Sequence, residues 1–521
     1  MDTKALRQKI LDLAIRGKLV PQDPNDEPAS VLLGRIRAKK KQLVKEGKLK
    51  AKDIKNDTVI YVGEDNLHYE KFHDGTVKCI EDELPFEVPD GWAWCRYSHV
   101  IELYSGQDLT SNRYNNIGEG IPYITGASNL KHGKVIINRW TTTPTTHATI
   151  GDLLLTVKGS GVGKMAFCDI ADAHIARQIM ALRCTNAITP QYLHIAISAM
   201  LSDITAQANG IIPGIRREIV LGAYLPLPPI NEQYKICEIA YNSLHIIDII
   251  DGDKDELKKA IQTTKSKMLD LAIRGKLVPQ DPNDEPASVL LERIHEEKEK
   301  LIKQGKIKRN KKESVIFRGD DNSYYESVNK IIVPFEQDAL FNLPANWTWC
   351  RIRNIASVQG GKRLPKGTDF SDTLTDHAYI RVADMKNRTV NATNLKYISD
   401  DVYEQIKSYT ISSKDLYVTI AGTIGVVGEV PDSLDGMNLT ENAVKICNIA
   451  IDKEYLCYIL LSSFVQHQFQ DKTHQVAMPK LALERILTTL IPLPPLDEQK
   501  KIVNAVNKCI FRLNSIQELL A

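Results

Sequence analysis

Polar and basic side chains gather beside glycine-containing turns at several places in the sequence. The stretches are YSGQDLTSNRYNN (104–116), GIRRE (214–218), QGGKRLPKG (359–367) and YIRVADMKNR (379–388). Arginine fits the edge of guanine, asparagine and glutamine fit adenine, and lysine and arginine bind phosphate oxygens. These residue types therefore predict recognition of nucleic acid. A position in loops would also explain their polarity, so each single contact remains open.

The residues that we select as candidates for contact with DNA come from these stretches and from neighbouring turns. They are Ser105, Gln107, Asn112, Arg113, Tyr123, Thr125, Lys158, Arg216, Arg217, Gln359, Lys362, Arg363, Arg381, Lys386 and Lys480. A further basic cluster has ten lysines and arginines among the 21 residues from Arg35 to Lys55. This cluster and residues 293–312 fit a solvated helix or arm about as well as a phosphate contact.

The glycine-rich run VKGSGVGKM (157–165) suggests a second chemistry, the binding of a nucleotide phosphate. Lys158 stands where such a loop needs its first glycine, and Met165 stands where it needs a hydroxyl for a metal ion. The related run IAGTIGVVG (420–428) has no lysine. A glycine-rich turn between two strands is therefore the favoured interpretation of both runs.

No set of residues in the sequence forms a recognisable catalytic site. The nine cysteines are scattered without a Cys-x-x-Cys pair, which favours reduced thiols in the cytoplasm over a zinc site. LPLPPINEQ (225–233) and IPLPPLDEQ (491–499) contain Pro-Pro, but a leucine precedes it where a methyltransferase loop would have an acid or amide. We expect these motifs to be rigid hinges, and we expect no metal or cofactor in this chain.

The elements that position the candidates occur twice. LDLAIRGKLVPQDPNDEPASVLL is found at residues 11–33 and again, without a change, at 269–291. WAWCR (92–96) is matched by WTWCR (347–351), and the two Pro-Pro motifs correspond in the same order. A repeat of this length predicts two copies of one structural unit.

Each copy contains a mixed segment followed by a helix. Residues 85–228 and 335–494 hold short β-branched runs between Gly, Asn and Pro turns, which predicts compact α+β domains. From Asn231 the apolar residues follow a 3,4 spacing, which predicts a long helix with one packing seam. The seam residues are Ile236, Ile239, Ile246, Ile250, Leu257, Ile261, Met268 and Leu271. DGDKDE (251–256) is a candidate interruption of this helix.

The two ends of the chain together repeat this helix. Ile502, Val506 and Ile510 begin the same pattern near the C-terminus, and by the shift of the repeat the N-terminal residues continue it. We therefore expect the terminal helices to pack antiparallel to the central helix. The predicted fold class is α+β, with two globular domains related by pseudo-twofold symmetry and joined by long antiparallel coiled-coil helices.

Composition is typical of a globular protein. Hydrophobic residues make up 43% and charged residues 25%, and the net charge is only +2. No apolar run approaches the ~18 residues of a membrane-spanning helix, so we expect a cytoplasmic protein. A charge this small does not by itself indicate nucleic acid, which leaves local patches as the predicted contact surfaces.

The order of these motifs resembles the specificity subunits of type I restriction-modification systems over essentially the whole chain. Leu225–Gln233 and Ile491–Gln499 are similar to the hinge that ends each target-recognition domain, and LAIRGKLVPQDPNDEPASVLL is similar to the end of the helical spacer. The resemblance implies target-recognition domains at 85–228 and 335–494. It also implies a spacer split between 1–60 and 495–521, with a central spacer at 229–312.

The resemblance further implies a noncatalytic subunit that recognises a bipartite site in double-stranded DNA. Its expected partners are two methyltransferase (modification) subunits, which methylate adenine with S-adenosylmethionine, and restriction subunits that use ATP and magnesium. Two copies of one partner would explain the identical segments, and two unlike half-sites would explain the divergent domains. Recombination that homogenised the segments is a rival history. A twin-domain protein-binding scaffold and a nucleotide-binding enzyme remain alternative functions.

Overall fold

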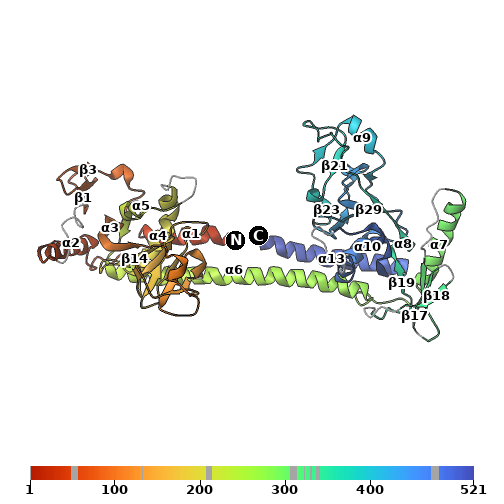
Figure 1. The fold of residues 1–521 in the computed structure, drawn as a ribbon, viewed down its shortest axis with the longest axis horizontal. Helices are drawn as coiled ribbons and strands as arrows, with labels where there is room; N and C mark the ends of the chain where they lie inside the picture. The colour runs from red at the N-terminus through yellow and green to blue at the C-terminus, as the bar shows by residue number, and fades with distance from the viewer. Residues whose placement is uncertain are drawn as a thin grey trace. The chain divides into compact units, whose positions relative to one another are not determined.

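The computed structural model describes residues 2–47, 57–131, 133–206, 214–305, 314–321, 323–328, 331–335, 341–470 and 480–520. The chain divides into two compact units, Met1–Lys254 and Asp255–Ala521, which are called unit 1 and unit 2 below. The division falls inside one 44-residue helix, α6 (Ile230–Ile273), labelled in Figure 1. The predicted interruption at 251–256 was wrong. One glycine costs a helix only ~1 kcal/mol, and the surrounding Lys, Glu and Leu residues favour it.

Unit 1 begins with two helices and a small sheet that precede its domain. The helices are α1 (Thr3–Ile15) and α2 (Ala29–Lys45). The antiparallel sheet is β1 (Val59–Val62), β2 (His68–Lys71) and β3 (Val77–Cys79). Arg96 holds it to the domain, because its guanidinium bonds both carboxylate oxygens of Glu70, whose side chain is fully buried.

The domain of unit 1 is built on two four-stranded sheets. The first has the order β12 (Met165–Phe167), β11 (Leu153–Thr156), β14 (Ile179–Cys184), β5 (Ile101–Ser105). The second has the order β10 (His147–Ala148), β13 (Ala173–Ile175), β6 (Ile121–Ile124), β9 (Trp140–Thr141), with β13 parallel to β6. Around them lie α3 (Tyr97–Val100), α4 (Pro190–Ala206), α5 (Arg217–Gly222) and the pair β4 (Ala93–Arg96) and β15 (Tyr224–Leu227).

Unit 2 repeats this order of strands. After α7 (Ala287–Lys303) come β16 (Ser314–Arg318), β17 (Tyr324–Val328) and β18 (Ile331–Pro334). The first four-stranded sheet is β27 (Val427–Glu429), β26 (Leu416–Thr419), β29 (Ala443–Cys447), β20 (Ser357–Gly360). The second is β25 (Thr410–Ile411), β28 (Met437–Leu439), β21 (Ala378–Ile380), β24 (Lys396–Tyr397), again with one parallel pair.

The remaining elements of unit 2 complete the domain and the helical part. They are α8 (Ile352–Ile355), α9 (Asp400–Ile406), α10 (Lys453–Leu461), α11 (Ser463–Gln470), α12 (Leu483–Thr488), α13 (Leu496–Leu519), the pair β19 (Thr348–Arg351) and β30 (Leu490–Leu493), and the hairpin β22 (Met385–Lys386) and β23 (Thr389–Val390). The predicted α+β class is confirmed. The predicted domain limits remain predictions.

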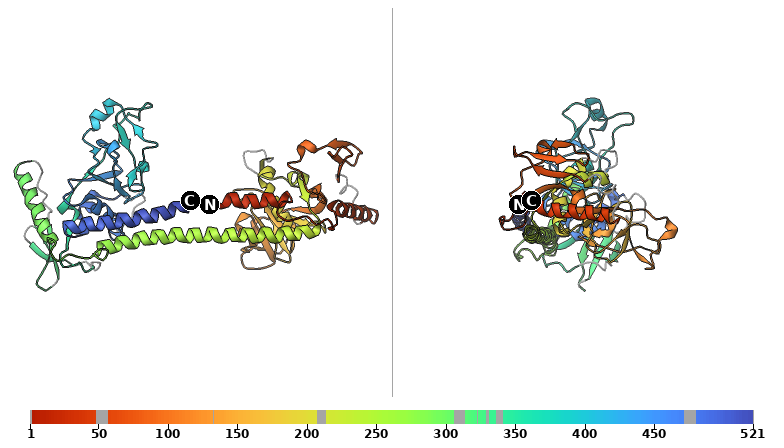
Figure 2. Two further views of the ribbon diagram at one scale, coloured as in Figure 1. Left: turned by 180° about the vertical axis from the view of Figure 1, so that it is seen from behind. Right: turned by 90° about the vertical axis from the view of Figure 1, so that its left-hand side faces the viewer.

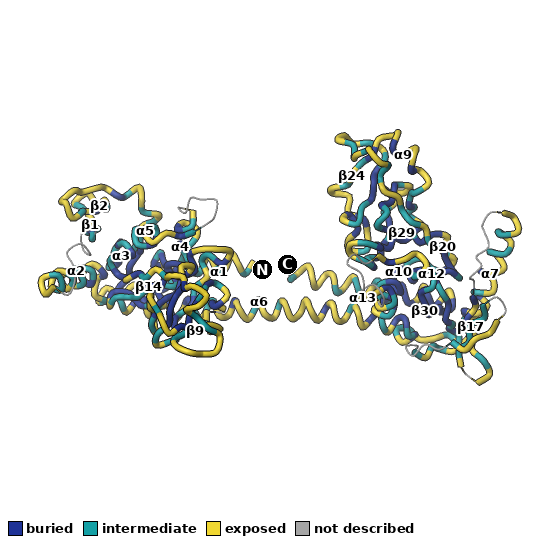
Figure 3. The backbone as a smooth tube through the Cα atoms, viewed as in Figure 1, coloured by how far each residue is buried: buried dark blue, intermediate teal, exposed yellow. Residues whose placement is uncertain are grey.

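The core of each domain lies at its first four-stranded sheet. The apolar runs of β11 and β26 are buried at every position, so both faces of these central strands are covered. Figure 3 shows the buried core in dark blue around their neighbours β14 and β29. Cys95 and Cys350 are each 1% exposed and pack in the core. Burial raises the pKa of the Cys350 thiol to about 12, so it stays protonated.

The terminal helices pack antiparallel to α6, each within its own unit. In unit 1, Arg7 Nη2 lies 2.6 Å from Asp248 Oδ1, and Gln22, beyond the end of α1, donates to Glu232 at 3.2 Å. As the residue numbers rise along the N-terminal segment, the residues of α6 that it contacts have falling numbers, so the two segments run antiparallel. In unit 2, Lys265 donates to Asn514 at 2.7 Å within the same antiparallel arrangement, which Figure 2 shows from behind.

The single packing seam predicted for α6 was wrong. Ile236, Ile261 and Met268 are buried, whereas Ile246 and Leu257 are 57% and 42% exposed. Ile236, Ala240 and Ile247 form the buried stripe of unit 1, and the other apolar residues lie on a different side of the helix. At about 100° per residue, Ile246 lies about 80° around the helix from Ile236, so it falls beside the buried stripe of unit 1 rather than in it. None of the helices in the described ranges has the length and apolarity that a membrane crossing requires.

Candidate nucleic-acid interface

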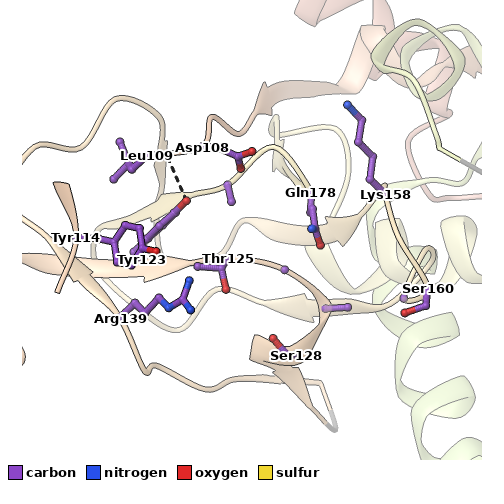
Figure 4. A pocket seen from close by; sticks show the side chains of 14 residues that line it. Asp108, Leu109, Tyr114, Tyr123, Thr125, Ser128, Arg139, Lys158, Ser160 and Gln178 are labelled. Atoms are coloured by element: carbon purple, nitrogen blue, oxygen red, sulfur yellow. Dashed lines mark hydrogen bonds between the residues drawn. The ribbon is translucent and has the colours of Figure 1, made fainter. Parts of the chain in front are cut away.

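A pocket of about 530 Å³ opens in unit 1 where several loops of the domain meet. It is lined from the loops that follow β5, β6 and β13 and from the turn between β11 and β12. Three predicted residues, Tyr123, Thr125 and Lys158, lie in its wall. Figure 4 shows Tyr114, Tyr123 and Arg139 on one side and Asp108, Gln178 and Lys158 along another. The pocket offers aromatic faces beside both charged and neutral polar groups.

The aromatic side of this pocket is rigid. The hydroxyl of Tyr123 accepts a hydrogen bond from the backbone N–H of Leu109 at 3.2 Å, and its ring lies 5.5 Å from that of Tyr114. Burial raises the pKa of Tyr123, so the phenol stays protonated. The Arg139 guanidinium lies 5.0 Å from the centre of the Tyr114 ring. Such fixed donors and rings are suited to recognise a planar group by shape and hydrogen bonding.

Unit 2 has a pocket of about 370 Å³ at the corresponding position. Tyr379 takes the place of Tyr123, and its ring lies 5.6 Å from Phe370. Its hydroxyl donates to the backbone oxygen of Lys362 at 2.6 Å, and burial raises its pKa to about 12. Arg363 and Arg381 line this pocket where unit 1 has Asp108 and smaller residues. The two frames are alike and their linings differ.

The glycine-rich run of unit 1 is a hairpin turn. Strands β11 and β12 on either side pair antiparallel, with Leu155 opposite Met165, and Gly159 and Gly163 have φ angles of +86° and +89°. A phosphate-binding loop leads from a strand into a helix, so the nucleotide-binding alternative is wrong for this segment. The turn instead brings Lys158 and Ser160 to the pocket.

Some of the predicted residues bond neighbouring loops through the same side chains that were expected to contact DNA. Arg113 donates to Oγ1 and the backbone oxygen of Thr143 at 2.9 and 2.8 Å. Arg381 bonds the carboxylate of Asp384 and donates to the backbone oxygen of Asn394 at 2.8 Å. Arg217 donates to the backbone oxygen of Leu103. Their contact with DNA remains a prediction, and a structural role of these arginines is now evident.

The other predicted residues present exposed side chains. In unit 1 they are Ser105 at the end of β5, Gln107, Asn112, Lys158 and Arg216; in unit 2 they are Gln359, Lys362, Arg363, Lys386 in β22, and Lys480 before α12. Lys158 also forms a β-bridge with Gly214, which brings GIRRE beside the pocket. Unit 1 thus gathers two of the predicted sequence stretches around one cavity.

The sequence reading missed Asp108, Arg139, Arg177 and Gln178, which lie in or beside the pocket of unit 1. Arg177 stands between the lining residues Ala176 and Gln178, and it forms an ion pair with Asp108. Arg177 and Gln178 lie in the run ARQ (176–178), which corresponds to TEN (440–442) in unit 2. Nothing in the local composition of ARQ distinguishes it from an ordinary turn.

The chain shares sequence and fold with known specificity subunits. The model of the type I restriction modification DNA specificity domain matches residues 344–519. The type I restriction enzyme EcoAI specificity subunit of Escherichia coli is 27% identical over 99% of this chain and 90% of its own length. The EcoEI specificity subunit of the same species is 26% identical over 96% and 88%.

A solved structure supports the fold independently. A chain from a study of complex assembly and conformational transition of the type I R-M system superimposes with a TM-score of 0.53 at 14% identity. The match covers 84% of this chain and 94% of that chain. The repeat, the two pockets and these matches agree, and the chain is similar to the DNA specificity subunits of type I restriction-modification systems.

Proposed function

We propose that the chain selects the DNA target of a type I restriction-modification complex, with each unit reading one half of a bipartite site. The observation that carries this proposal is the pair of pockets, which share a frame and differ in their linings. Equal frames would approach DNA in the same manner. Different linings would recognise different bases, because base edges are distinguished by their pattern of donors and acceptors.

In this proposal the chain itself performs no chemical step. Adenine methylation with S-adenosylmethionine belongs to two modification subunits, and ATP- and magnesium-dependent translocation and cleavage belong to restriction subunits. This chain supplies the sequence specificity and the docking surfaces. Because the target is double-stranded DNA of the cell or of an invading element, the complex would work in the cytoplasm.

The docking surfaces that we propose are the exposed parts of the two identical segments, 11–33 and 269–291. Val31 is 49% exposed and its counterpart Val289 is 41% exposed. Lys18, Asn25 and Ser30 are likewise exposed, as are the matching residues of the second segment. Two equal surfaces would accept two copies of one partner.

Internal packing accounts for another part of the identity. Gly17 and Gly275 have φ angles of +64° and +65°, and a Cβ on either would lie 2.4 Å from a proline ring, that of Pro89 or Pro344. Gln22 donates to the backbone oxygen of Gly17 at 2.6 Å, and Gln280 does the same with Gly275. These contacts account for the identity at the glycine and glutamine positions. They leave the exposed valine, serine and asparagine free to vary, which favours an external partner for those positions.

Helix α6 is the element that we propose as the spacer between the two readings. It runs without a break from unit 1 into unit 2. A continuous helix resists compression, so its length would set the preferred gap between half-sites, expected at about one DNA turn, ~10 base pairs centre to centre.

We expect the chain alone to bind DNA weakly. A net charge of +2 neutralises few phosphates, and affinity for DNA depends mostly on the number of phosphates neutralised. Modification subunits closing around the duplex would add the missing contacts. Equal affinity of the isolated chain and the complex at physiological salt would contradict this expectation.

Mapping methylated adenines in the host genome tests the function directly. Modified adenines in a split motif should disappear when the gene for this chain is deleted and return when it is restored. An unchanged methylation map after deletion would reject the proposal and favour a protein-binding role for the twin domains.

A further inference from the structure

The two pockets carry an ion pair at their edge in which the acid and the base have exchanged places. In unit 1, Arg177 Nε lies 2.7 Å from Asp108 Oδ2. In unit 2, Arg363 Nε lies 3.4 Å from Glu441 Oε1. Both pairs join the loop after the edge strand, β5 or β20, to the loop after the inner strand, β13 or β28.

Backbone hydrogen bonds fix which positions correspond. Gln107 N donates to Ile175 O and Lys362 N donates to Leu439 O, each at 2.9 Å; Ala176 N donates to Ile124 O at 2.9 Å and Thr440 N donates to Ile380 O at 3.1 Å. Asp108 and Arg363 directly follow the first pair of donors. Arg177 and Glu441 directly follow the second pair. The carboxylate of one unit therefore occupies the position of the guanidinium in the other.

In each pair the carboxylate is the anchored member. Asp108 Oδ1 accepts a hydrogen bond from the backbone N–H of Arg177 at 3.1 Å. Glu441 Oε2 accepts one from Thr440 Oγ1 at 3.1 Å, and its side chain is only 28% exposed. The side chains of Arg177 and Arg363 are 70% and 76% exposed. Within the described ranges, these guanidinium groups bond no other residue, so their Nη groups remain available.

The other arginines near the pockets are engaged differently. Arg113 and Arg381 donate hydrogen bonds to backbone oxygens, and Arg139 lies against the ring of Tyr114. Arg177 and Arg363 thus combine an exposed donor fork with a fixed carboxylate beside it. A guanidinium oriented in this way can donate to O6 and N7 of guanine, and the adjacent carboxylate can accept from N4 of cytosine.

We infer that the Asp108–Arg177 and Glu441–Arg363 pairs are specificity determinants that each read one G·C base pair of their half-site. This inference rests on the proposed function. Guanine lies on the Arg177 side in unit 1 and on the Arg363 side in unit 2. Since these are opposite loops of the same frame, the base pair read at this position is inverted in one half-site relative to the other.

The test uses the assembled complex of this chain with its modification subunits and a pool of DNA duplexes randomised in both half-sites. Sequencing of the bound and methylated duplexes gives the preference at every position. Arg177→Lys keeps the charge that a phosphate contact needs and loses the bidentate fork. It should reduce the preference for guanine at one position of one half-site by about 5- to 150-fold. Arg363→Lys should do the same in the other half-site only.

The double variant Asp108→Arg, Arg177→Glu reproduces in unit 1 the arrangement of unit 2. It should change the preference at the affected position from one orientation of the G·C pair to the other. Circular dichroism and thermal unfolding of each variant confirm that the fold is kept, and the untouched half-site serves as the internal control.

Three outcomes are distinguishable. Loss of preference at a single position supports the inference. A weaker binding that is uniform over all sequences, or a preference that does not change, overturns it, because the pairs would then contact phosphates only or nothing. If the wild-type complex itself selects no split motif, the proposed function fails, independently of these variants.

Discussion

Trp92 donates a hydrogen bond from Nε1 to Oε2 of Glu232, 3.0 Å away, and so joins the start of the first domain to the helix that follows it. Gln22 donates to the other oxygen of the same carboxylate. Unit 2 repeats the contact between Trp347 and Glu498 at 2.9 Å. Burial raises the pKa of Glu232, although its two donors act in the opposite direction. In unit 1 the carboxylate of Glu232 therefore connects the identical segment, the domain and the helix, and Glu498 has the corresponding position in unit 2.

Replacing Glu232 by alanine should destabilise unit 1. The indole N–H of Trp92 would lose its acceptor, and a buried donor without a partner costs about 1–3 kcal/mol, whereas the Gln22 amide keeps the backbone oxygen of Gly17. Urea unfolding measures the change, and Glu498→Ala should have a similar effect on unit 2. The exposed ion pair of Glu27 with Arg35 supplies the control, because Glu27→Ala should cost less than about 1 kcal/mol. Equal effects of Glu232→Ala and Glu27→Ala would contradict the structural role.

His99 should make the stability of unit 1 sensitive to acid. Burial, helped by Lys40 and Arg37, lowers the pKa of His99 to about 3, so the folded unit keeps the ring neutral. The unfolded chain binds a proton near pH 6.5. Stability contributed by His99 is thus present above pH 6.5 and is lost as the pH falls toward 3. Between pH 7.5 and 5.5 the expected loss is about 1 kcal/mol.

The second unit provides the matched variant for this test. Asn354 occupies the position of His99. Its Oδ1 accepts a hydrogen bond from the backbone N–H of Arg351 at 2.8 Å, just as Nδ1 of His99 accepts one from the backbone N–H of Arg96. His99→Asn should keep the contact and remove the contribution of His99 to the pH dependence. Urea unfolding of both proteins at the two pH values gives the difference. Identical pH dependence in the variant would show that His99 does not titrate in the manner expected.

Val31→Lys and Val289→Lys should each prevent the docking of one modification subunit. Both valines are exposed, so the domains should fold, whereas a buried charge at an interface is strongly unfavourable. Mass measurement of the complex should give two modification subunits for the wild type, one for either single variant and none for the double variant. Val62→Lys, on the exposed surface of β1, is the control. Full occupancy in the double variant would exclude this surface.

Seven residues inserted after Asp253, with a matching extension of the N-terminal helix, should lengthen the preferred gap between half-sites. Seven residues add about 10.5 Å to a helix, equivalent to at most about 3 base pairs. Asp253 is exposed, so the insertion disturbs no core contact. Methylation mapping of the variant measures the gap. A gap of unchanged length would reject α6 as the spacer.

The sequence by itself determined the repeated plan of the molecule and the long helix. Runs such as LLLT and LYVT are short, mostly apolar and bounded by turn residues, a pattern that favours a strand covered on both faces. The two Pro-Pro motifs marked the starts of α6 and α13, because proline is favoured at the start of a helix and excluded from its interior. Such patterns are local, so they can be recognised without knowing what surrounds them.

Only the tertiary structure decided which polar residues face the pockets. The sequence does not show that Arg113 bonds Thr143, nor that Arg177 forms an ion pair with Asp108. In α6 the sequence shows apolar residues at helical spacing, but the elements that pack against the helix determine which of these residues are buried. A side chain's role depends on partners that are distant along the chain, and residue spacing carries no information about those partners before the strands pair.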